Sequence, residues 1–117
     1  MKRRIRQVLF DLGIPFNLKG FTYLEYAIDY IISVDEKSFT QVCIAVGEEL
    51  FIQHESIYNS ILSTIKRVDR DSDAWKRYVN MDTKSNIEII YAIAFNIMKE
   101  IEYEQDISAR DSKRLEV

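Results

Sequence analysis

The residues that could carry catalysis are few in this sequence, and they do not form a familiar catalytic motif. The single histidine, His54, has no serine or cysteine partner at a spacing typical of an activated nucleophile. The single cysteine, Cys43, falls on an apolar helical stripe, where packing is the usual role of a thiol. Paired carboxylates such as Glu48 and Glu49 have the pattern of a solvated helix face. We therefore expect no enzymatic activity and no catalytic residue.

The sequence also has too few residues of the types that bind metals, form disulfides or hold cofactors. A structural zinc site needs about four Cys or His ligands, and a disulfide needs two thiols. One cysteine and one histidine cannot supply either within a single chain. No glycine-rich phosphate-binding loop occurs in the sequence. We expect neither a bound metal nor a cofactor.

Polar side chains that could bind nucleic acid gather in one segment, residues 55–69. Positions between its apolar residues carry serine, threonine, asparagine and arginine, which can bind base edges or phosphates. The residues of this outward face are Ser56, Asn59, Ser60, Ser63, Thr64 and Arg67. A merely solvated helix face would have the same composition, so the pattern alone favours neither interpretation.

Helical periodicity over most of the chain predicts the elements that position this face. Apolar residues recur at intervals of three and four, which is typical of amphipathic helices. The fold class we predict is all-α, a compact bundle of about six helices. The expected helices cover residues 3–12, 21–34, 39–50, 55–69, 73–80 and 86–104. Three residue pairs have the spacing of an N-terminal capping box: Thr22 and Glu25, Ser38 and Gln41, and Ser85 and Glu88.

Glycine and proline mark two further features of this bundle. Gly13 stands where a left-handed residue would end the first helix, and Pro15 prevents its continuation. Gly47 lies inside the expected helix 39–50, where it costs about 1 kcal/mol relative to alanine. That cost indicates close approach by a neighbouring helix. Helices 39–50 and 55–69, joined by about four residues, have the outline of a helix-turn-helix, which any pair of connected helices can share.

Length and composition indicate one helical domain. The chain has 117 residues, of which 47% are hydrophobic, enough for one core. Three glycines and one proline are too few for the many turns of a β-sandwich or barrel. We assign residues 1–105 to the domain that contains the helix-turn-helix. Residues 106–117 are polar and lose the helical period, so we expect a disordered tail.

No membrane-spanning or targeting segment is visible in the sequence. No apolar run approaches the roughly 18 residues needed to cross a bilayer. The basic N-terminus is followed by Asp11, Gly13 and Pro15, which interrupt a signal-peptide core. We expect a cytoplasmic protein that does not bind the membrane, with Cys43 as a reduced core thiol.

One long run of residues resembles the C-terminal DNA-binding effector domain of the stage-zero sporulation transcription factor A. The run reads Leu12-Gly13-Ile14-Pro15-x-x-Leu18-Lys19-Gly20-Phe21-x-Tyr23-Leu24-x-x-Ala27-Ile28. Scattered matches follow at 38–42, Phe51, Ser56 and 86–90, so the resemblance covers about residues 5–104. Domains of that family are all-helical with six helices. Their fourth helix enters the major groove, and their fifth contributes to contacts between domains bound in tandem on DNA.

The resemblance implies a sequence-specific, DNA-binding transcriptional regulator of the sporulation-effector type. Helix 55–69 becomes the recognition helix and helix 39–50 its support. The implied partners are double-stranded DNA, a second copy in a homodimer or in tandem on DNA, and RNA polymerase. Base and sugar contacts fall to Ser56, Asn59, Ser60, Ser63 and Thr64, and phosphate contacts to Ser38, His54, Lys66 and Arg67.

The sequence also departs from that family. Asn59, Ser60, Ser63 and Thr64 are uncharged where the family has several basic side chains, so arginine–guanine pairing is not available there. The family's DNA sequence preference therefore cannot be carried over. No receiver domain accompanies the run, so we expect no control by phosphorylation. The alternative function is a protein–protein interaction module that kept this fold but lost DNA binding.

Charge leaves room for the DNA interpretation despite the net charge of −3. Residues 1–78 balance 11 basic against 11 acidic side chains, so the acidity lies in residues 79–117. Phosphate neutralisation supplies much of the affinity for DNA. Five basic residues that could supply it cluster after the start of the candidate recognition helix, and two more lie nearby in sequence: Lys66, Arg67, Arg70, Lys76 and Arg77, with Lys37 and Lys19. Aspartates are interleaved with them and weaken their field.

Overall fold

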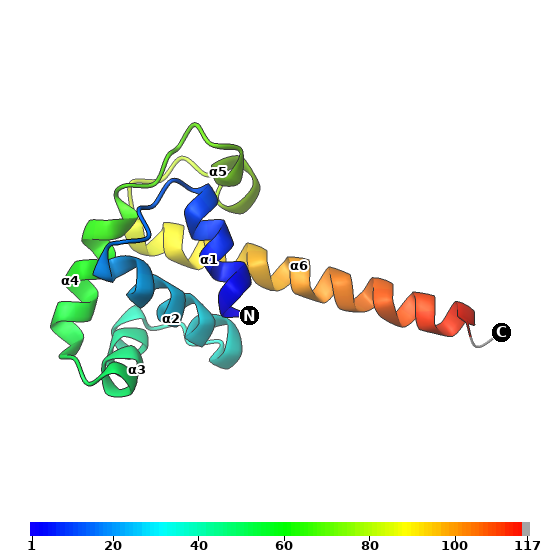
Figure 1. Ribbon diagram of the computed structural model, residues 1–117, viewed down its shortest axis with the longest axis horizontal. Coiled ribbons are helices and arrows are strands. Elements are labelled where there is room, and N and C mark those ends of the chain that lie inside the picture. Colours follow the sequence, from blue (N-terminus) through cyan, green and yellow to red (C-terminus); the bar gives the residue numbers. More distant parts are fainter. Residues whose placement is uncertain (116–117) are drawn as a thin grey trace.

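The computed structural model describes the backbone of residues 1–115 and the side chains of residues 1–110. Six helices form this part of the chain, and it contains no strand. They are α1 (Lys2–Asp11), α2 (Lys19–Val34), α3 (Phe39–Leu50), α4 (His54–Ile65), α5 (Asp73–Tyr78) and α6 (Asn86–Leu115). The prediction of a compact all-α bundle is therefore confirmed (Figure 1).

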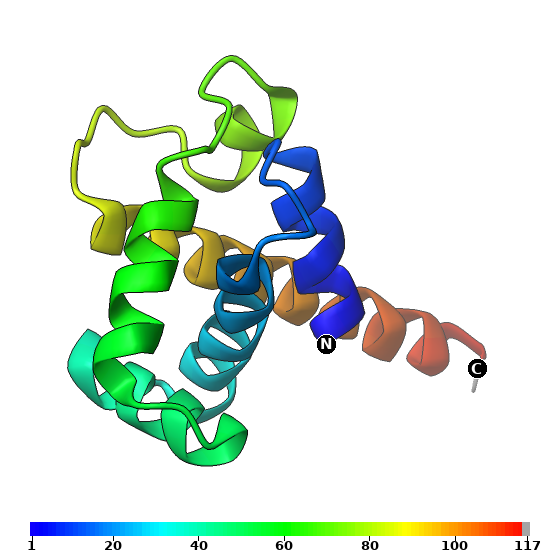
Figure 2. The same cartoon turned by 60° about the vertical axis from the view of Figure 1, so that its left-hand side comes forward.

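Helix α2 forms the centre of the bundle. It packs against α1, α3, α4 and α6, and α5 closes one end through contacts with α1 and α6. Figure 2 shows α2 enclosed by α4 on one side and by α1 and α6 on the others. The apolar stripes read from the sequence meet in one core, where each fully buried isoleucine or leucine contributes about 1.5–3 kcal/mol. Side chains with no exposed surface include Ile5, Leu9, Leu24, Ile28, Ile57, Ile61, Ile65, Ile90 and Ile93.

Most predicted helix ends are confirmed by their local chemistry. Gly13 has φ +82°, the left-handed conformation that ends α1. The Ser38 hydroxyl accepts a hydrogen bond from the backbone N–H of Gln41 at 3.4 Å, and this caps α3. The Ser85 hydroxyl does the same for the N–H of Glu88 at 3.3 Å at the start of α6. Two of the three predicted serine or threonine caps therefore begin helices, but the reciprocal bond of the capping box is absent. The N–H of Ser38 donates to Oε1 of Glu36, and the N–H of Ser85 donates to Oγ1 of Thr83, both at 3.0 Å.

The third predicted box, Thr22 with Glu25, is wrong. Helix α2 already begins at Lys19, after an N-cap residue, Leu18, that makes no side-chain cap. Glu25 is buried, and its Oε1 accepts a hydrogen bond from Nε of Arg6 on α1 at 3.0 Å. The Glu25 carboxylate, which the local spacing assigned to a cap, therefore binds Arg6 of α1 instead.

Helix α4 ends at Ile65, four residues before its predicted end at residue 69. The backbone N–H of Val68 donates to the carbonyl of Ile65 at 3.2 Å, which tightens the last turn. The N–H of Asp69 then donates to the carbonyl of Leu12 at 2.7 Å. This bond ties the chain to the end of α1 and prevents α4 from continuing.

Helix α6 continues beyond its predicted end at residue 104 and projects from the bundle (Figure 1). Residues 106–115, expected to be a disordered tail, are helical, and residues 116–117 lie outside the described residues. No glycine or proline follows Gly47 in the sequence, so nothing in the local chemistry stops this helix. At 1.5 Å per residue, its 30 residues span about 45 Å.

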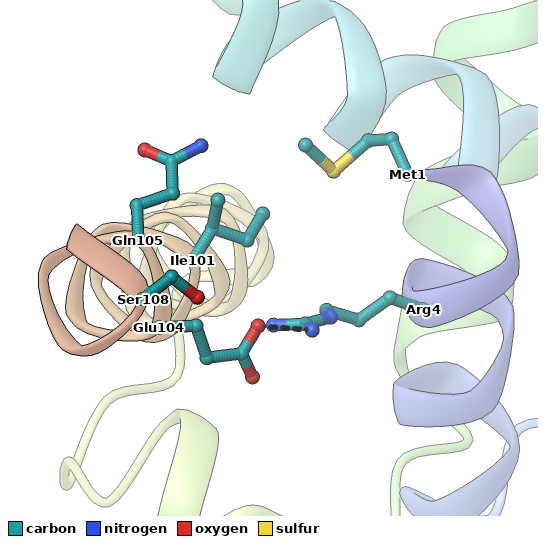
Figure 3. A pocket seen from close by; sticks show the side chains of 6 residues that line it. All are labelled: Met1, Arg4, Ile101, Glu104, Gln105 and Ser108. Atoms are coloured by element: carbon teal, nitrogen blue, oxygen red, sulfur yellow. Dashed lines mark hydrogen bonds and ion pairs between the residues drawn. The ribbon is translucent and has the colours of Figure 1, made fainter. Parts of the chain in front are cut away.

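Ion pairs fix α6 at the point where it leaves the bundle. Nη2 of Arg4 donates to Oε2 of Glu104 at 2.6 Å, and Nε of Arg77 donates to Oε1 of Glu100 at 3.1 Å. An open pocket of about 500 Å³ lies between α1 and α6, and Figure 3 shows the Arg4–Glu104 pair at its edge, with Met1 and Ile101 above it. These contacts join α1, α5 and α6.

Candidate nucleic-acid interface

The turn between α3 and α4 folds directly onto α3 at Gly47. A Cβ atom at this position would overlap the carbonyl oxygen of Ile52, and it would lie 3.5 Å from the backbone nitrogen of His54. The close approach predicted at Gly47 is confirmed, but the approaching segment is the turn. Phe51 ends α3 with φ 58°, and its N–H donates to the carbonyl of Gly47. The two helices and this three-residue turn form the predicted helix-turn-helix.

Three of the predicted contact residues lie together on the exposed face of α4. Ser56, Asn59 and Ser63 are exposed and follow the spacing i, i+3, i+7, so they share one side of the helix. Ser60 is half-buried, at the edge of this face toward α2. We refer to Ser56, Asn59 and Ser63 as the polar face of α4.

Thr64 does not belong to this face, which corrects the prediction for that residue. Only 5% of Thr64 is exposed. Its side chain packs against Gly20 of α2, where a Cβ atom would overlap Thr64 Oγ1 and lie 2.6 Å from the carbonyl oxygen of Ser60. Helix α2 therefore crosses α4 at close range and covers Thr64, while Ser63 in the same turn stays exposed.

Basic side chains are concentrated at the C-terminal end of α4. Lys66 occupies the C-cap position of α4, and Arg67 is the next residue. Both side chains are exposed. Lys19, exposed at the start of α2, is adjacent in sequence to Gly20 and therefore lies near the same end of α4. Lys19 was predicted as a nearby cation but not as a contact residue; the signal that places it at this end of α4 is Gly20, the small residue that permits the helix crossing.

The N-terminal end of α4 is acidic instead. Glu48, Glu49 and Glu55 are exposed around the turn. His54 is the first residue of α4, half-buried, and its Nε2 lies 3.2 Å from Oε1 of Glu55. A carboxylate this close opposes a phosphate at His54. The geometry therefore favours phosphate contacts at Lys66 and Arg67 over His54.

Ser38 lies beside the middle of α4. It precedes Phe39, whose ring centroid is 5.6 Å from that of Tyr58 on α4. A shallow depression of about 270 Å³ between α3 and α4 is lined by Thr40, Cys43, His54, Glu55, Tyr58 and Asn59. The N-terminus of α3 is thus brought to the same side of the molecule as the polar face, while the Ser38 hydroxyl itself caps the helix.

Cys43 is fully buried beneath this surface, and burial raises the pKa of its thiol from 9.0 to about 11. At pH 8 the folded protein should therefore react with a disulfide reagent at least about a hundredfold more slowly than the unfolded chain. As pH rises, the thiol ionises at a lower pH in the unfolded chain than in the folded protein, and this ionisation stabilises the unfolded chain. Hence the free energy of unfolding should fall between about pH 9 and pH 11.

A Cys43→Ala variant should lack that part of the pH dependence, as followed by urea denaturation between pH 8 and pH 11. The pKa of Tyr78 is raised from 10.0 to about 12 by burial and by Glu100, so its contribution has the same sign at higher pH. Fast modification of folded Cys43 at pH 8 would show that the thiol is accessible.

Comparisons of the chain with protein-family models, with curated proteins and with solved structures gave no match. Within the described residues, no helix combines the length and apolar character required to traverse a bilayer. The same residues contain no cluster of three His, Cys, Asp or Glu side chains that could hold a metal ion. The fold and the site define an all-α domain in which the second helix of the helix-turn-helix, α4, exposes one polar face.

Proposed function

We propose that this domain binds double-stranded DNA through the polar face of α4 and acts as a transcriptional regulator. The observation that carries the proposal is the exposed series Ser56, Asn59 and Ser63, which leads directly to the cations Lys66 and Arg67. Helix α4 has 12 residues and is about 18 Å long, and a major groove about 12 Å wide admits a single helix. The resemblance to sporulation effector domains supports the same use of this helix.

The charge distribution sets which part of α4 would approach the duplex. The exposed charges around its N-terminal end are the carboxylates of Glu48, Glu49 and Glu55. At its C-terminal end, the three cations Lys19, Lys66 and Arg67 outnumber the exposed carboxylates that follow in the chain, Asp69 and Asp71. Docking is therefore expected toward the C-terminal half, with Asn59 and Ser63 at base edges. Asparagine can pair with adenine through two hydrogen bonds, which gives sequence discrimination without arginine.

The direct test is a fluorescence-anisotropy titration against a random-sequence duplex library. Lys19, Lys66 and Arg67 would make three phosphate contacts. Three contacts predict a slope of roughly −3 when the logarithm of affinity is plotted against the logarithm of salt concentration. Binding should be detected at low ionic strength and be lost as salt is added. No salt-sensitive binding at low ionic strength would refute the proposal.

Charge-neutralising variants locate the contact. Replacing Lys66 and Arg67 with glutamine should lower the affinity roughly tenfold and reduce the salt slope by about 2. The matched control replaces Arg3 and Arg110 with glutamine, because these exposed residues carry the same charge on α1 and distal α6. Equal losses in both double variants would mean that net charge alone, and not the α4 surface, drives binding.

A protein–protein interaction module is the second candidate, and one observation favours it. Phe51 is 95% exposed in the turn of the helix-turn-helix, among Glu48, Glu49 and Glu55. An exposed aromatic ring in a segment with three exposed carboxylates and no lysine or arginine suits a protein surface better than a phosphate backbone. A folded protein that fails the DNA titration, at every salt concentration, would favour this function.

We also propose the finer attributes that the resemblance implies: a role in sporulation, tandem occupancy of DNA and contact with RNA polymerase. Their support is the run from Leu12 to Ile28 and the scattered later matches. A single domain with three phosphate contacts should bind weakly. Two copies on adjacent sites would raise the effective concentration of each and so the specificity.

A further inference from the structure

A small apolar hollow lies between the end of α2 and the middle of α6, and no residue of α4 lines it. Its volume is about 180 Å³, and apolar cavities of roughly 150 Å³ can hold benzene. Phe95 at its edge is 55% exposed, so the hollow is open to molecules from solvent. The apolar and aromatic side chains that line it are Ile31, Ile32, Tyr91, Ala94, Phe95 and Met98. The space suits one apolar group about the size of a phenyl or an isobutyl group.

Two hydrogen bonds hold the segment that follows α2 against this hollow. The Tyr91 hydroxyl of α6 donates to the backbone carbonyl of Glu36 at 3.1 Å. Oε1 of Glu36 accepts a hydrogen bond from the backbone N–H of Ser38 at 3.0 Å. Residues 35–37 are therefore fixed beside the apolar walls, and their side chains form a charged rim.

The charged rim carries both signs of charge within three consecutive residues. Asp35, Glu36 and Lys37 all line the hollow, and the side chains of Asp35 and Lys37 are exposed. No ion pair among residues 1–110 involves Asp35 or Lys37. One carboxylate and one ammonium group therefore remain to bind a molecule whose apolar part fills the hollow.

The end of α2 adds a further preference for a cation at this place. The last carbonyl groups of a helix carry a partial negative charge, which a nearby cation stabilises. Helix α2 has 16 residues and no basic residue in its last turn. Asp35 is its C-cap residue, so the carboxylate and the helix end both favour a ligand ammonium group at the same part of the rim.

We propose that this hollow binds a free α-amino acid with an apolar side chain of the size of leucine or phenylalanine. The side chain would lie against Ile31 and Tyr91, with the flexible Met98 adapting to it. The ammonium group would bind Asp35 and the end of α2, and the carboxylate would bind Lys37. A ligand with one charge leaves part of the rim unmatched, whereas a zwitterion matches both signs. For a ligand of about 10 non-hydrogen atoms in an open site, a dissociation constant of roughly 0.1–1 mM is expected.

A titration of the ¹⁵N-labelled protein, followed by the shifts of its backbone amides in two-dimensional NMR spectra, tests this proposal. L-leucine and L-phenylalanine, added up to about 20 mM, should give saturable shifts of amides in segments 31–37 and 91–98. Two analogues keep the side chain of leucine but only one of its charges: 4-methylpentanoate lacks the ammonium group, and 3-methylbutylamine lacks the carboxylate. Each should bind roughly fivefold more weakly than leucine, because one exposed ion pair is lost.

Variants at the rim assign each charge of the ligand to its partner. Asp35→Asn keeps a residue that tolerates the left-handed backbone at φ 58°, so the variant should fold. It should bind leucine roughly fivefold more weakly and no longer prefer leucine over 4-methylpentanoate. Lys37→Gln should in the same way lose the preference for leucine over 3-methylbutylamine.

The chain offers a matched control in Asp82 and Lys84, which repeat the Asp-x-Lys spacing on exposed residues outside the hollow. Asp82→Asn combined with Lys84→Gln should leave the affinity for leucine unchanged. The amide spectrum of each variant reports its fold in the same sample. Absence of saturable shifts with both amino acids would overturn the proposal. So would shifts confined to other segments, or an affinity that neither Asp35→Asn nor Lys37→Gln alters.

Discussion

Replacing Gly20 with alanine is expected to destabilise the folded protein by about 2 kcal/mol. The new Cβ atom would overlap Thr64 Oγ1 and lie 2.6 Å from the backbone carbonyl oxygen of Ser60. Overpacking of this kind costs roughly 1–3 kcal/mol, and a rigid backbone neighbour favours the upper end. The higher helix propensity of alanine returns about 1 kcal/mol. Urea denaturation monitored by circular dichroism measures the difference.

Two companion variants test the cause of this loss. Thr22→Ala lies in the same helix on an exposed position, so its free energy of unfolding should change by less than about 0.5 kcal/mol. Combining Gly20→Ala with Thr64→Ala removes the overlap with Oγ1 and should recover part of the stability. The approaches of 2.6 Å to the Ser60 carbonyl oxygen and to the Cβ atom of residue 64 remain. If Gly20→Ala is as stable as the wild type, α2 does not cross α4 at this distance, and the assignment of Lys19 to the DNA-facing surface fails with it.

The polar face of α4 was largely predictable, because burial of one helix face leaves the opposite face exposed. The inward residues Ile57, Ile61 and Ile65 are all fully buried, and their period places Ser56 and Asn59 outward. The same period excludes Thr64, which stands seven residues after Ile57 and three after Ile61 and so lies on the inward side; its polar side chain led to the wrong assignment. What the sequence does not show is which segment covers Thr64: this is α2 at Gly20, a contact between segments more than 40 residues apart.

The errors at helix ends have the same origin in contacts between distant segments. Thr22 and Glu25 have correct capping spacing, but Arg6 of α1 binds the carboxylate. Helix α4 stops early because the N–H of Asp69 bonds the carbonyl of Leu12. Where a helix end depends on its own first or last turn, as at Ser38, the local pattern was sufficient. At Glu25 and Asp69 the deciding contact comes from another helix, and such a contact leaves no local pattern in the sequence.

Helix α6 shows a different limit of sequence patterns. Its apolar stripe ends near Ile101, and the loss of period led to a predicted end at residue 104. The periodicity, however, reports contact with a core and does not report helix formation itself. Residues 102–110 are all exposed, yet the helix continues through them without glycine or proline. The end of the apolar stripe therefore marks where α6 leaves the bundle, and the helix continues beyond that point.

Two isoleucines of α6 make this distinction measurable. Ile93 is fully buried, whereas Ile107 is 38% exposed beyond the bundle. Ile93→Ala should lower the free energy of unfolding by about 3 kcal/mol, because it removes buried methyl groups and leaves a cavity. Ile107→Ala should change it by less than about 0.5 kcal/mol. Both substitutions alter helix propensity equally, so the difference between them, measured by urea denaturation, isolates burial.

The pair of variants also tests whether distal α6 packs against anything in the monomer. A cost at Ile107 similar to that at Ile93 would mean that the projecting part of α6 is buried in solution, either by folding back or by a second copy. Repeating the measurement at two protein concentrations separates these cases, since stabilisation by a second copy grows with concentration. A small cost at Ile107 that does not vary with concentration is expected, because the core that holds α6 ends near Ile97, with Ile101 only partly covered.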